Sequence, residues 1–458
     1  MPLLGFRFFG LCAAGALLCR VLPGRCFLWV LAACNLVLAA ANGALSFGVT
    51  FGCLMLTYFT GKAAFALRDA GKSPRLPVSL AAAVIVGAML CFRGKVPGIS
   101  FFGLMLLGYL FDVASGACER PVSALPFAAC GAFFPLMSQG PIVRIAEFSE
   151  TAHGIRVSFE TALNGLYRIL WGLVKKLILA ERLGILVRAV YAAPESFSSL
   201  AVWSAAILSA FEIYADFSGC MDIVLGVAAL FGLKPGENFK RPYLARDFTD
   251  YWKRWHITMG AWFRTYVFYP LAASAPVRFL TERVWKTLPS PSAKRAAVVA
   301  VPLLATWLLT GIWHGSGMHY ALSGLMNGLV LLAGTLLPNG MKRRPAPLAV
   351  LHTFTVGALI RVMFRAESVV KAGAVYRGLF SFRGGAGFGA MGLDVQDALV
   401  ALCFLLVLIA ADIYEERGRK IGNPTLKAAL AFLGVCALIL FGHYGPGYAP
   451  GEFFYARF

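Results

Sequence analysis

The chain has 458 residues, of which 59% are hydrophobic and 14% are charged. Because soluble domains average about 45–50% apolar and about 25% charged residues, this composition excludes an ordinary soluble domain. The formal net charge is +20, but the basic residues lie in short gaps between apolar runs, as in loops beside anionic lipid, which argues against a nucleic-acid partner.

Apolar runs recur from one end of the chain to the other. The first 20 residues carry no charged side chain before Arg7, and the apolar run resumes directly after Arg25. We therefore expect a first membrane helix here rather than a signal peptide. Further apolar runs cover 26–62, 76–92, 99–111, 122–137, 200–211, 296–337, 398–411 and 428–441.

These runs predict an all-α membrane protein. A crossing helix needs about 20 apolar residues, and only helices and closed barrels satisfy the backbone in lipid. The runs are too long and too continuous for barrel strands. Counting one or two crossings per run, we predict a polytopic protein with roughly 10–13 membrane-embedded helices. We expect a single membrane domain over residues 1–458.

Two polar regions interrupt the series of apolar runs. Region 139–188 is amphipathic, with Lys175 and Lys176 beside leucine and isoleucine. It could lie in the membrane interface or pack inside a helix bundle. Region 234–270 is the most polar and aromatic-rich part of the chain, although long apolar runs flank it. This mixture predicts a partly re-entrant segment that faces a cavity.

Carboxylates occur within the apolar segment FEIYADFSGCMDIVLG. Glu212 and Asp216 are four residues apart and share one face of a helix, whereas Asp222 points elsewhere. Buried carboxylates need partners, and we expect them from the basic cluster at 240–264. A purely structural ion-pair network is the alternative interpretation.

His256 lies in the segment YWKRWHITMGAWFRTYVF. If this segment is one helix, then Trp252, Trp255, His256 and Met259 share a face. The alternative is an aromatic belt at the membrane interface, with basic residues as anchors.

His314 is the most informative residue of the chain. It lies in the stretch 296–341, which contains no Asp, Glu, Lys or Arg and can cross a bilayer roughly twice. Ionisable groups at membrane depth are costly and indicate a functional site by default. The alternative is a histidine at a helix end that is wet or bonded to a backbone carbonyl.

The sequence lacks the patterns of several other chemistries. The eleven cysteines form no CxxC pair, HExxH is absent, and His314 and His319 are five residues apart, so no metal site is predicted. The segment GSG after His314 is not a GxSxG nucleophile elbow. The remaining chemistry is general-base catalysis by a histidine. The histidine would deprotonate a hydroxyl, and the hydroxyl would then attack an activated acyl carbon. A transporter with His314 and the carboxylates as a proton relay is the alternative, but paired broken helices are not evident.

Several blocks of the sequence carry a family resemblance. The chain resembles the membrane-bound O-acyltransferase family, in the bacterial branch that contains the alginate O-acetylation protein and the teichoic-acid D-alanyltransferase. The matching blocks occur in the expected order and are 96–113, 133–144, 213–271, TGIWHG at 310–315, VMFRAES at 362–368 and the terminal YGPGYAPGEFFYARF.

The resemblance implies a fold and a site. The fold is a ring of helices around a central tunnel or funnel, in which His314 matches the essential histidine and His256 the second, supporting one. Other motif positions are implied to shape the substrate tunnel or to support the structure. They are Asp216, Asn238, Tyr243, Trp255, Arg264 and Trp313.

The resemblance also implies a function. It is transfer of an acyl group, acetyl in our interpretation, from an activated cytoplasmic thioester such as acetyl-coenzyme A to hydroxyls of an exported polysaccharide. No cofactor is expected to be tightly bound. The implied setting is the bacterial plasma membrane, with lipid around the helices and an extracytoplasmic esterase-like partner.

The close alternative is D-alanyl transfer to teichoic acid from a phosphopantetheine carrier protein. Three departures from the family pattern, Glu212, Met318-His319 and Met363, are expected at the cavity wall near His314 and bear on the identity of the acceptor.

Overall fold

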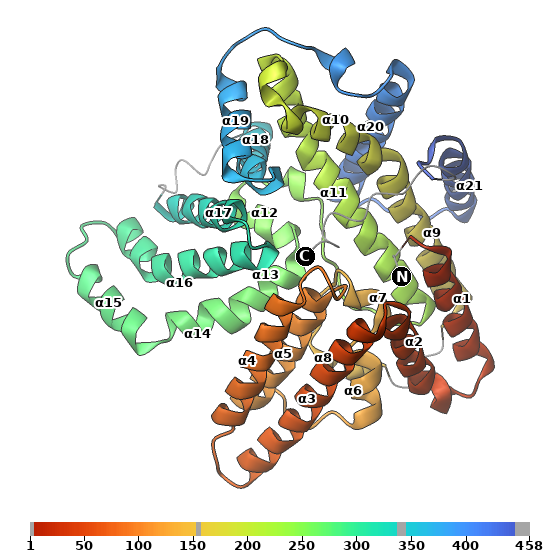
Figure 1. Ribbon diagram of the computed structural model, residues 1–458, viewed down its shortest axis with the longest axis vertical. Coiled ribbons are helices and arrows are strands. Elements are labelled where there is room, and N and C mark those ends of the chain that lie inside the picture. The colour runs from red at the N-terminus through yellow and green to blue at the C-terminus, as the bar shows by residue number, and fades with distance from the viewer. Residues whose placement is uncertain (1–3, 153–156, 337–344, 445–458) are drawn as a thin grey trace. The chain divides into compact units, whose positions relative to one another are not determined.

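The computed structural model describes residues 4–152, 157–336 and 345–444, and within these ranges the chain is helical (Figure 1). The described part contains no strand ladder, and isolated bridges pair Phe197 with Ala386 and Phe239 with Trp255. The predicted all-α class is confirmed. The chain divides into two compact units. Unit 1 takes the described residues of Met1–Leu173 and Gly219–Glu237, and unit 2 takes those of Val174–Ser218 and Asn238–Tyr448.

Eight helices of the described chain are long and apolar enough to cross a membrane. They are Gly24–Ala41, Ala44–Asp69, Ser199–Leu230, Pro291–His314, Met318–Leu336, Ala346–Arg365, Val395–Glu416 and Pro424–Phe441. Two further apolar helices of the described chain, Arg75–Cys91 and Ile99–Ser115, are shorter than these eight, and the number of roughly 10–13 membrane-embedded helices stays a prediction. The N-terminal helix, where we expect a first crossing, has 16 residues and is not among the eight. The ring and tunnel, and the single domain, stay predictions.

Unit 1 contains the N-terminal helices. They are α1 (Phe6–Val21), η1 (Gly24–Cys26), α2 (Phe27–Ala41), α3 (Ala44–Asp69), α4 (Arg75–Cys91), α5 (Ile99–Ser115), α6 (Ala124–Cys130), α7 (Phe134–Met137), α8 (Ile145–Thr151) and α9 (Phe159–Val174). The C-terminal part of α11 (Ser199–Leu230) also belongs to this unit. There a Cβ on Gly172 would lie 2.5 Å from the carbonyl oxygen of Gly219, so α9 and α11 pack backbone against backbone.

Unit 2 contains the remaining helices. They are η2 (Lys175–Ala180), α10 (Glu181–Ala192), η3 (Pro194–Ser196), the first part of α11, η4 (Pro242–Leu244), α12 (Phe248–Arg254), α13 (Ile257–Phe263), η5 (Arg264–Phe268), α14 (Tyr269–Ala272), α15 (Ala275–Trp285), α16 (Pro291–His314), α17 (Met318–Leu336), α18 (Ala346–Arg365), α19 (Val369–Phe380), η7 (Phe388–Ala390), α20 (Val395–Glu416) and α21 (Pro424–Phe441). Region 234–270 thus breaks into short helices, none of them long enough to span a bilayer.

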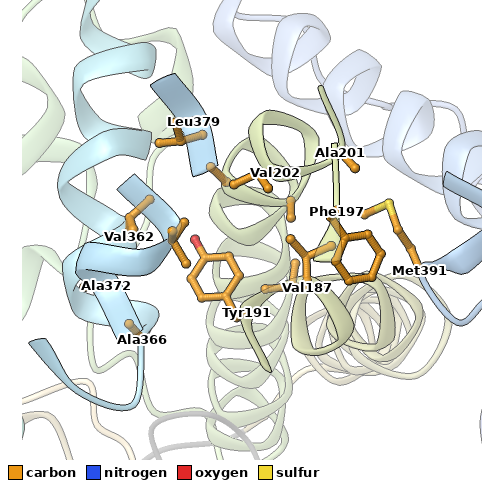
Figure 2. Close-up of a cluster of buried hydrophobic side chains, with 14 residues drawn as sticks. Val187, Tyr191, Phe197, Ala201, Val202, Val362, Ala366, Ala372, Leu379 and Met391 are labelled. Atoms are coloured by element: carbon orange, nitrogen blue, oxygen red, sulfur yellow. The ribbon is translucent and has the colours of Figure 1, made fainter. Parts of the chain in front are cut away.

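The apolar core of unit 2 joins α10, α11, α18 and α19. Figure 2 shows Tyr191 among aliphatic side chains of this cluster, which includes Val202 of α11 and Leu379 of α19. Val362 and Ala366, at the C-terminal end of α18, are also buried in it. The core therefore holds the end of α18, which carries the side chains that reach the candidate site.

The helices α16 and α17 run side by side with little space between them (Figure 1). A Cβ on Gly311 would lie 2.4 Å from the carbonyl oxygen of Tyr320, and one on Gly324 would lie 2.2 Å from that of Trp307. Small residues permit this close approach of two apolar helices, as they do in membrane bundles. This contact through Gly311 and Gly324, here called the glycine seam, places the last turn of α16 against the first turn of α17.

Candidate functional site

His314 is the last residue of α16, and its side chain is enclosed by aromatic rings. The residue is only 8% exposed. Ring centroids lie 4.7 Å away for Trp313 and 5.1 Å away for Phe364 of α18, and Tyr320 of α17 lies 5.4 Å from Phe364. Rings from three helices therefore form an aromatic enclosure, in which the imidazole lies against Trp313 and Phe364 and Tyr320 lies against Phe364.

His256 is the second imidazole of this enclosure. It is 1% exposed, and its ring centroid lies 6.5 Å from that of His314, 6.1 Å from Trp313 and 4.8 Å from Phe217. The structure thus brings together two histidines that are far apart in the sequence. Burial, and to a smaller extent the neighbouring His314, lowers the pKa of His256 well below its ordinary value of 6.5. His256 is therefore neutral at physiological pH.

The segment 252–259 is not one helix, so the condition under which Trp252, Trp255, His256 and Met259 would share a helical face is not met. The helix α12 ends at Arg254, α13 begins at Ile257, and His256 between them has a left-handed backbone with φ of 48°. The cause is tertiary pairing with segment 238–240. The amide of Lys240 donates to the carbonyl of Arg254, and the amide of Ile257 donates to that of Asn238.

Asn238 anchors the corner at His256. The residue is fully buried, and its Oδ1 accepts from the amide of Thr258 at 3.1 Å and from the Thr258 hydroxyl at 3.0 Å. Because the side chain of His256 does not cap α13, Asn238 supplies the N-terminal cap from a separate segment. Its predicted supporting position therefore has a physical basis in this corner.

Tyr243 and Trp255 surround the guanidinium of Arg361 on α18. The guanidinium carbon lies 4.5 Å from the Trp255 ring centroid, and Arg361 donates to the hydroxyls of Tyr243, at 2.9 Å, and Tyr251. The Tyr243 hydroxyl in turn donates to the carbonyl of Ala210 on α11. These contacts tie segment 243–255 to α11 and α18, next to the corner that carries His256.

Asp216 belongs to a buried charge cluster in unit 2. Its Oδ1 lies 2.7 Å from Nζ of Lys176, and the same ammonium lies 2.7 Å from Oε1 of Glu181. Although burial alone lowers the pKa of Lys176, the two carboxylates raise it on balance. Glu212 forms a bidentate pair with Arg365, with both distances 3.0 Å.

We expected the basic cluster at 240–264 to supply the partners of Glu212 and Asp216, and this prediction is wrong. Lys176 comes from the π-helical segment η2 and Arg365 from the end of α18, because these elements pack on the carboxylate face of α11. Asp222 does point elsewhere, as expected, and pairs with Arg168 in unit 1 at 2.9 Å.

The other predicted positions are distributed differently. Arg264 is exposed at the start of η5, and Met318 is 66% exposed at the start of α17. His319 is buried against Gly317, whose added Cβ would lie 2.2 Å from the imidazole. Met363 packs against the core cluster of unit 2. The terminal block beyond Tyr444 lies outside the described residues.

Sequence reasoning missed two residues of the enclosure, Phe364 and Tyr320. Both stand beside residues that it did single out, since Phe364 follows Met363 and Tyr320 follows His319. An aromatic residue one position from an unusual motif residue was the available signal. Among the described residues, no group of three or more His, Cys, Asp or Glu side chains could hold a metal ion.

Comparison with known proteins identifies a family to which the sequence is similar. A sequence model of the membrane-bound O-acyltransferase family matches residues 114–363, which is more than half of the chain and includes both histidines. A probable alginate O-acetylase of Pseudomonas syringae pv. tomato is 28% identical over 335 residues, which cover 71% of this chain and 60% of that protein.

Two relatives that are named for other activities also match. A peptidoglycan O-acetyltransferase of Helicobacter pylori is 27% identical over 267 residues, which cover 57% of this chain and 47% of the relative. A teichoic acid D-alanyltransferase of Streptococcus thermophilus is 26% identical over 243 residues, which cover 51% and 55%. The chain thus spans about half to three fifths of the length of these relatives.

Proposed function

The chain belongs to the membrane-bound O-acyltransferase family, and we propose that it transfers an acetyl group from an activated cytoplasmic donor toward hydroxyls of an exported cell-surface polysaccharide. The observation that carries the proposal is His314 inside its aromatic enclosure, with His256 beside it. The eight apolar helices support a multi-pass protein, which we place in the bacterial plasma membrane. The relatives named for O-acetylation support the acetyl group.

In the proposed reaction, His314 is the general base. A ring nitrogen of His314 accepts the proton of the acceptor hydroxyl, and the hydroxyl oxygen forms a bond to the carbonyl carbon of the acyl thioester. The carbon–sulfur bond then breaks, and the proton passes from His314 to the sulfur, which leaves as a thiol. The donor is acetyl-coenzyme A or another thioester, and the scheme uses no tightly bound cofactor and no metal.

The enclosure favours transfer to a hydroxyl over hydrolysis. Because the imidazole is only 8% exposed and lies against the rings of Trp313 and Phe364, we expect water to have little access to a thioester carbon beside it. Orientation of two bound reactants at one base adds the advantage of proximity. We assign His256 a supporting role, because a neutral imidazole at that distance can orient His314 or a substrate without competing for the proton.

A second candidate is D-alanyl transfer to teichoic acid, which the relative from Streptococcus thermophilus supports. It uses the same step at His314 with a D-alanyl thioester on a phosphopantetheine carrier protein. The acetyl scheme instead calls for an extracytoplasmic esterase-like partner that completes transfer to the sugar. The two schemes separate in a direct assay of the purified protein with acetyl and D-alanyl thioesters.

The test of the proposal uses the full chain in liposomes supplied with an acyl thioester and a small soluble hydroxyl acceptor, so that the readout does not depend on the partner that completes transfer to the sugar. We expect His314→Ala to abolish acyl transfer, whereas His352→Ala, which removes an exposed histidine of α18, leaves the rate unchanged. Full activity in H314A would contradict the assignment of the base. Flux of a solute without acyl transfer would favour the transporter interpretation.

A further inference from the structure

Phe364 forms one wall of the enclosure around His314. Its ring meets the imidazole edge to face, with 5.1 Å between centroids and 86° between planes. The ring of Tyr320 packs against Phe364, with 5.4 Å between the two ring centroids. Since His314 is only 8% exposed, the space beside its ring is narrow before any substrate binds.

This wall is held in place on both sides of Phe364. Val362 and Ala366 are buried in the core cluster of unit 2, and the guanidinium of Arg365 is fixed by two 3.0 Å bonds to Glu212. Tyr320 is equally constrained, because its ring lies 2.3 Å from the position of a Cβ on Gly315. The backbone that carries Phe364 is therefore held by packing on both sides, which favours a set position for this wall.

A set wall beside the base discriminates between acyl groups by size. An acetyl group adds one methyl to the carbonyl carbon, whereas longer chains add methylenes that must displace packed rings. Extra methylenes in a closely packed site are costly, and one methylene alone changes specificity by about 10–200-fold in enzyme pockets. Truncation of a buried phenylalanine leaves a cavity that packed surroundings fill only in part.

We propose that Phe364, backed by Tyr320, is the specificity-determining residue that restricts the transferred group to short acyl chains. This inference rests on the proposed function, since it assigns the acyl carbon to the space beside His314. It places acyl selection on α18 and gives the exposed Met318 no part in it.

The experiment measures transfer by the full chain in liposomes from acetyl-, butyryl- and octanoyl-pantetheine. We expect the wild type to prefer acetyl over octanoyl by about a hundredfold or more, and Phe364→Ala to lower this ratio to about tenfold or less. Phe354→Ala is the matched control. Phe354 lies on the same helix and is also half-buried, but it packs against Phe211 and Tyr243. We expect F354A to keep the wild-type ratio.

Graded variants guard against misfolding. Phe364→Leu, Phe364→Val and Phe364→Ala remove increasing volume, so the preference should fall stepwise in the variants whose thermal stability in detergent is close to that of the wild type. An unchanged ratio in folded variants that still transfer acetyl would overturn the inference and leave the proposed function standing. A wild type that accepts octanoyl as readily as acetyl would overturn it too.

Binding provides a readout that does not depend on turnover. Thioether analogues of the three pantetheine donors cannot react, and their affinity can be measured from the thermal shift of the protein. If no donor supports transfer but short analogues bind more tightly than long ones, and F364A removes this difference, then the size restriction holds while the proposed function fails. If the wild type and F364A show the same ratio of affinities for the short and the long analogues, the size restriction is overturned.

Discussion

The charge cluster around Lys176 permits a quantitative test of what stabilises unit 2. One ammonium lies 2.7 Å from each of two carboxylates, Asp216 and Glu181, and all three residues are buried. Asp216→Asn leaves an ammonium with one carboxylate, which is a balanced pair. Lys176→Met leaves two buried carboxylates without this cation. The two substitutions should therefore differ in cost, although each removes one charge.

The magnitudes follow from the burial of the group left behind. Removal of one partner from a buried ion pair costs about 3–5 kcal/mol when the remaining charge has no compensation, and we expect Lys176→Met to fall in this range. For Asp216→Asn we expect about 1–2 kcal/mol, because the amide oxygen still accepts a hydrogen bond and Glu181 still pairs with Lys176.

The assay is unfolding of the purified chain in mixed micelles by titration with dodecyl sulfate, followed by circular dichroism. Lys253→Met is the matched control, because this exposed lysine of unit 2 should contribute within about 0.5 kcal/mol. A free energy of unfolding for D216N that is lower than that for K176M would refute the reasoning. It would show that the cation, rather than the carboxylates, carries the desolvation cost.

Three further predictions concern the corner at His256. His256→Ala should lower the rate of acyl transfer less than His314→Ala, and the reverse order would exchange their roles. Asn238→Ala should lower the free energy of unfolding by about 2–3 kcal/mol, because two donors of Thr258 lose their acceptor, whereas Asn238→Asp keeps the acceptor and should cost less in the same titration. Because burial depresses the pKa of His256, the unfolded chain binds a proton below pH 6.5 that the folded chain does not. The stability from this group is thus present above pH 6.5, and below it the free energy of unfolding falls by up to about 1.4 kcal/mol per pH unit. This dependence on pH should flatten in His256→Asn when melting is measured from pH 7.5 to 5.

Features that depend on local composition could be predicted from the sequence. The apolar runs predict the long helices because backbone satisfaction in lipid leaves few alternatives, and the eight apolar helices agree. The only sequence signal that linked His256 with His314 was the order of the blocks that resemble the family. No periodicity links two residues separated by several helices.

Features that depend on tertiary contacts could not be predicted. The helix through Trp255 breaks because segment 238–240 pairs with it, and a helical pattern carries no trace of that competition. The partner of Asp216 is Lys176, forty positions away in the sequence, and the choice depends on how a π-helical segment packs on α11. The position of Phe364 beside Met363 is a weak sequence signal, and its role becomes visible only through its contact with His314 of α16.

The glycine seam between α16 and α17 has a consequence for motion around the base. Because Gly311 and Gly324 each lie against the facing backbone, the two helices cannot slide or rotate past each other without collision. We therefore expect His314 at the end of one helix and Tyr320 at the start of the next to move together. Any opening that admits a donor and releases a thiol therefore has to occur away from this pair of helices, for example at the corner that carries His256.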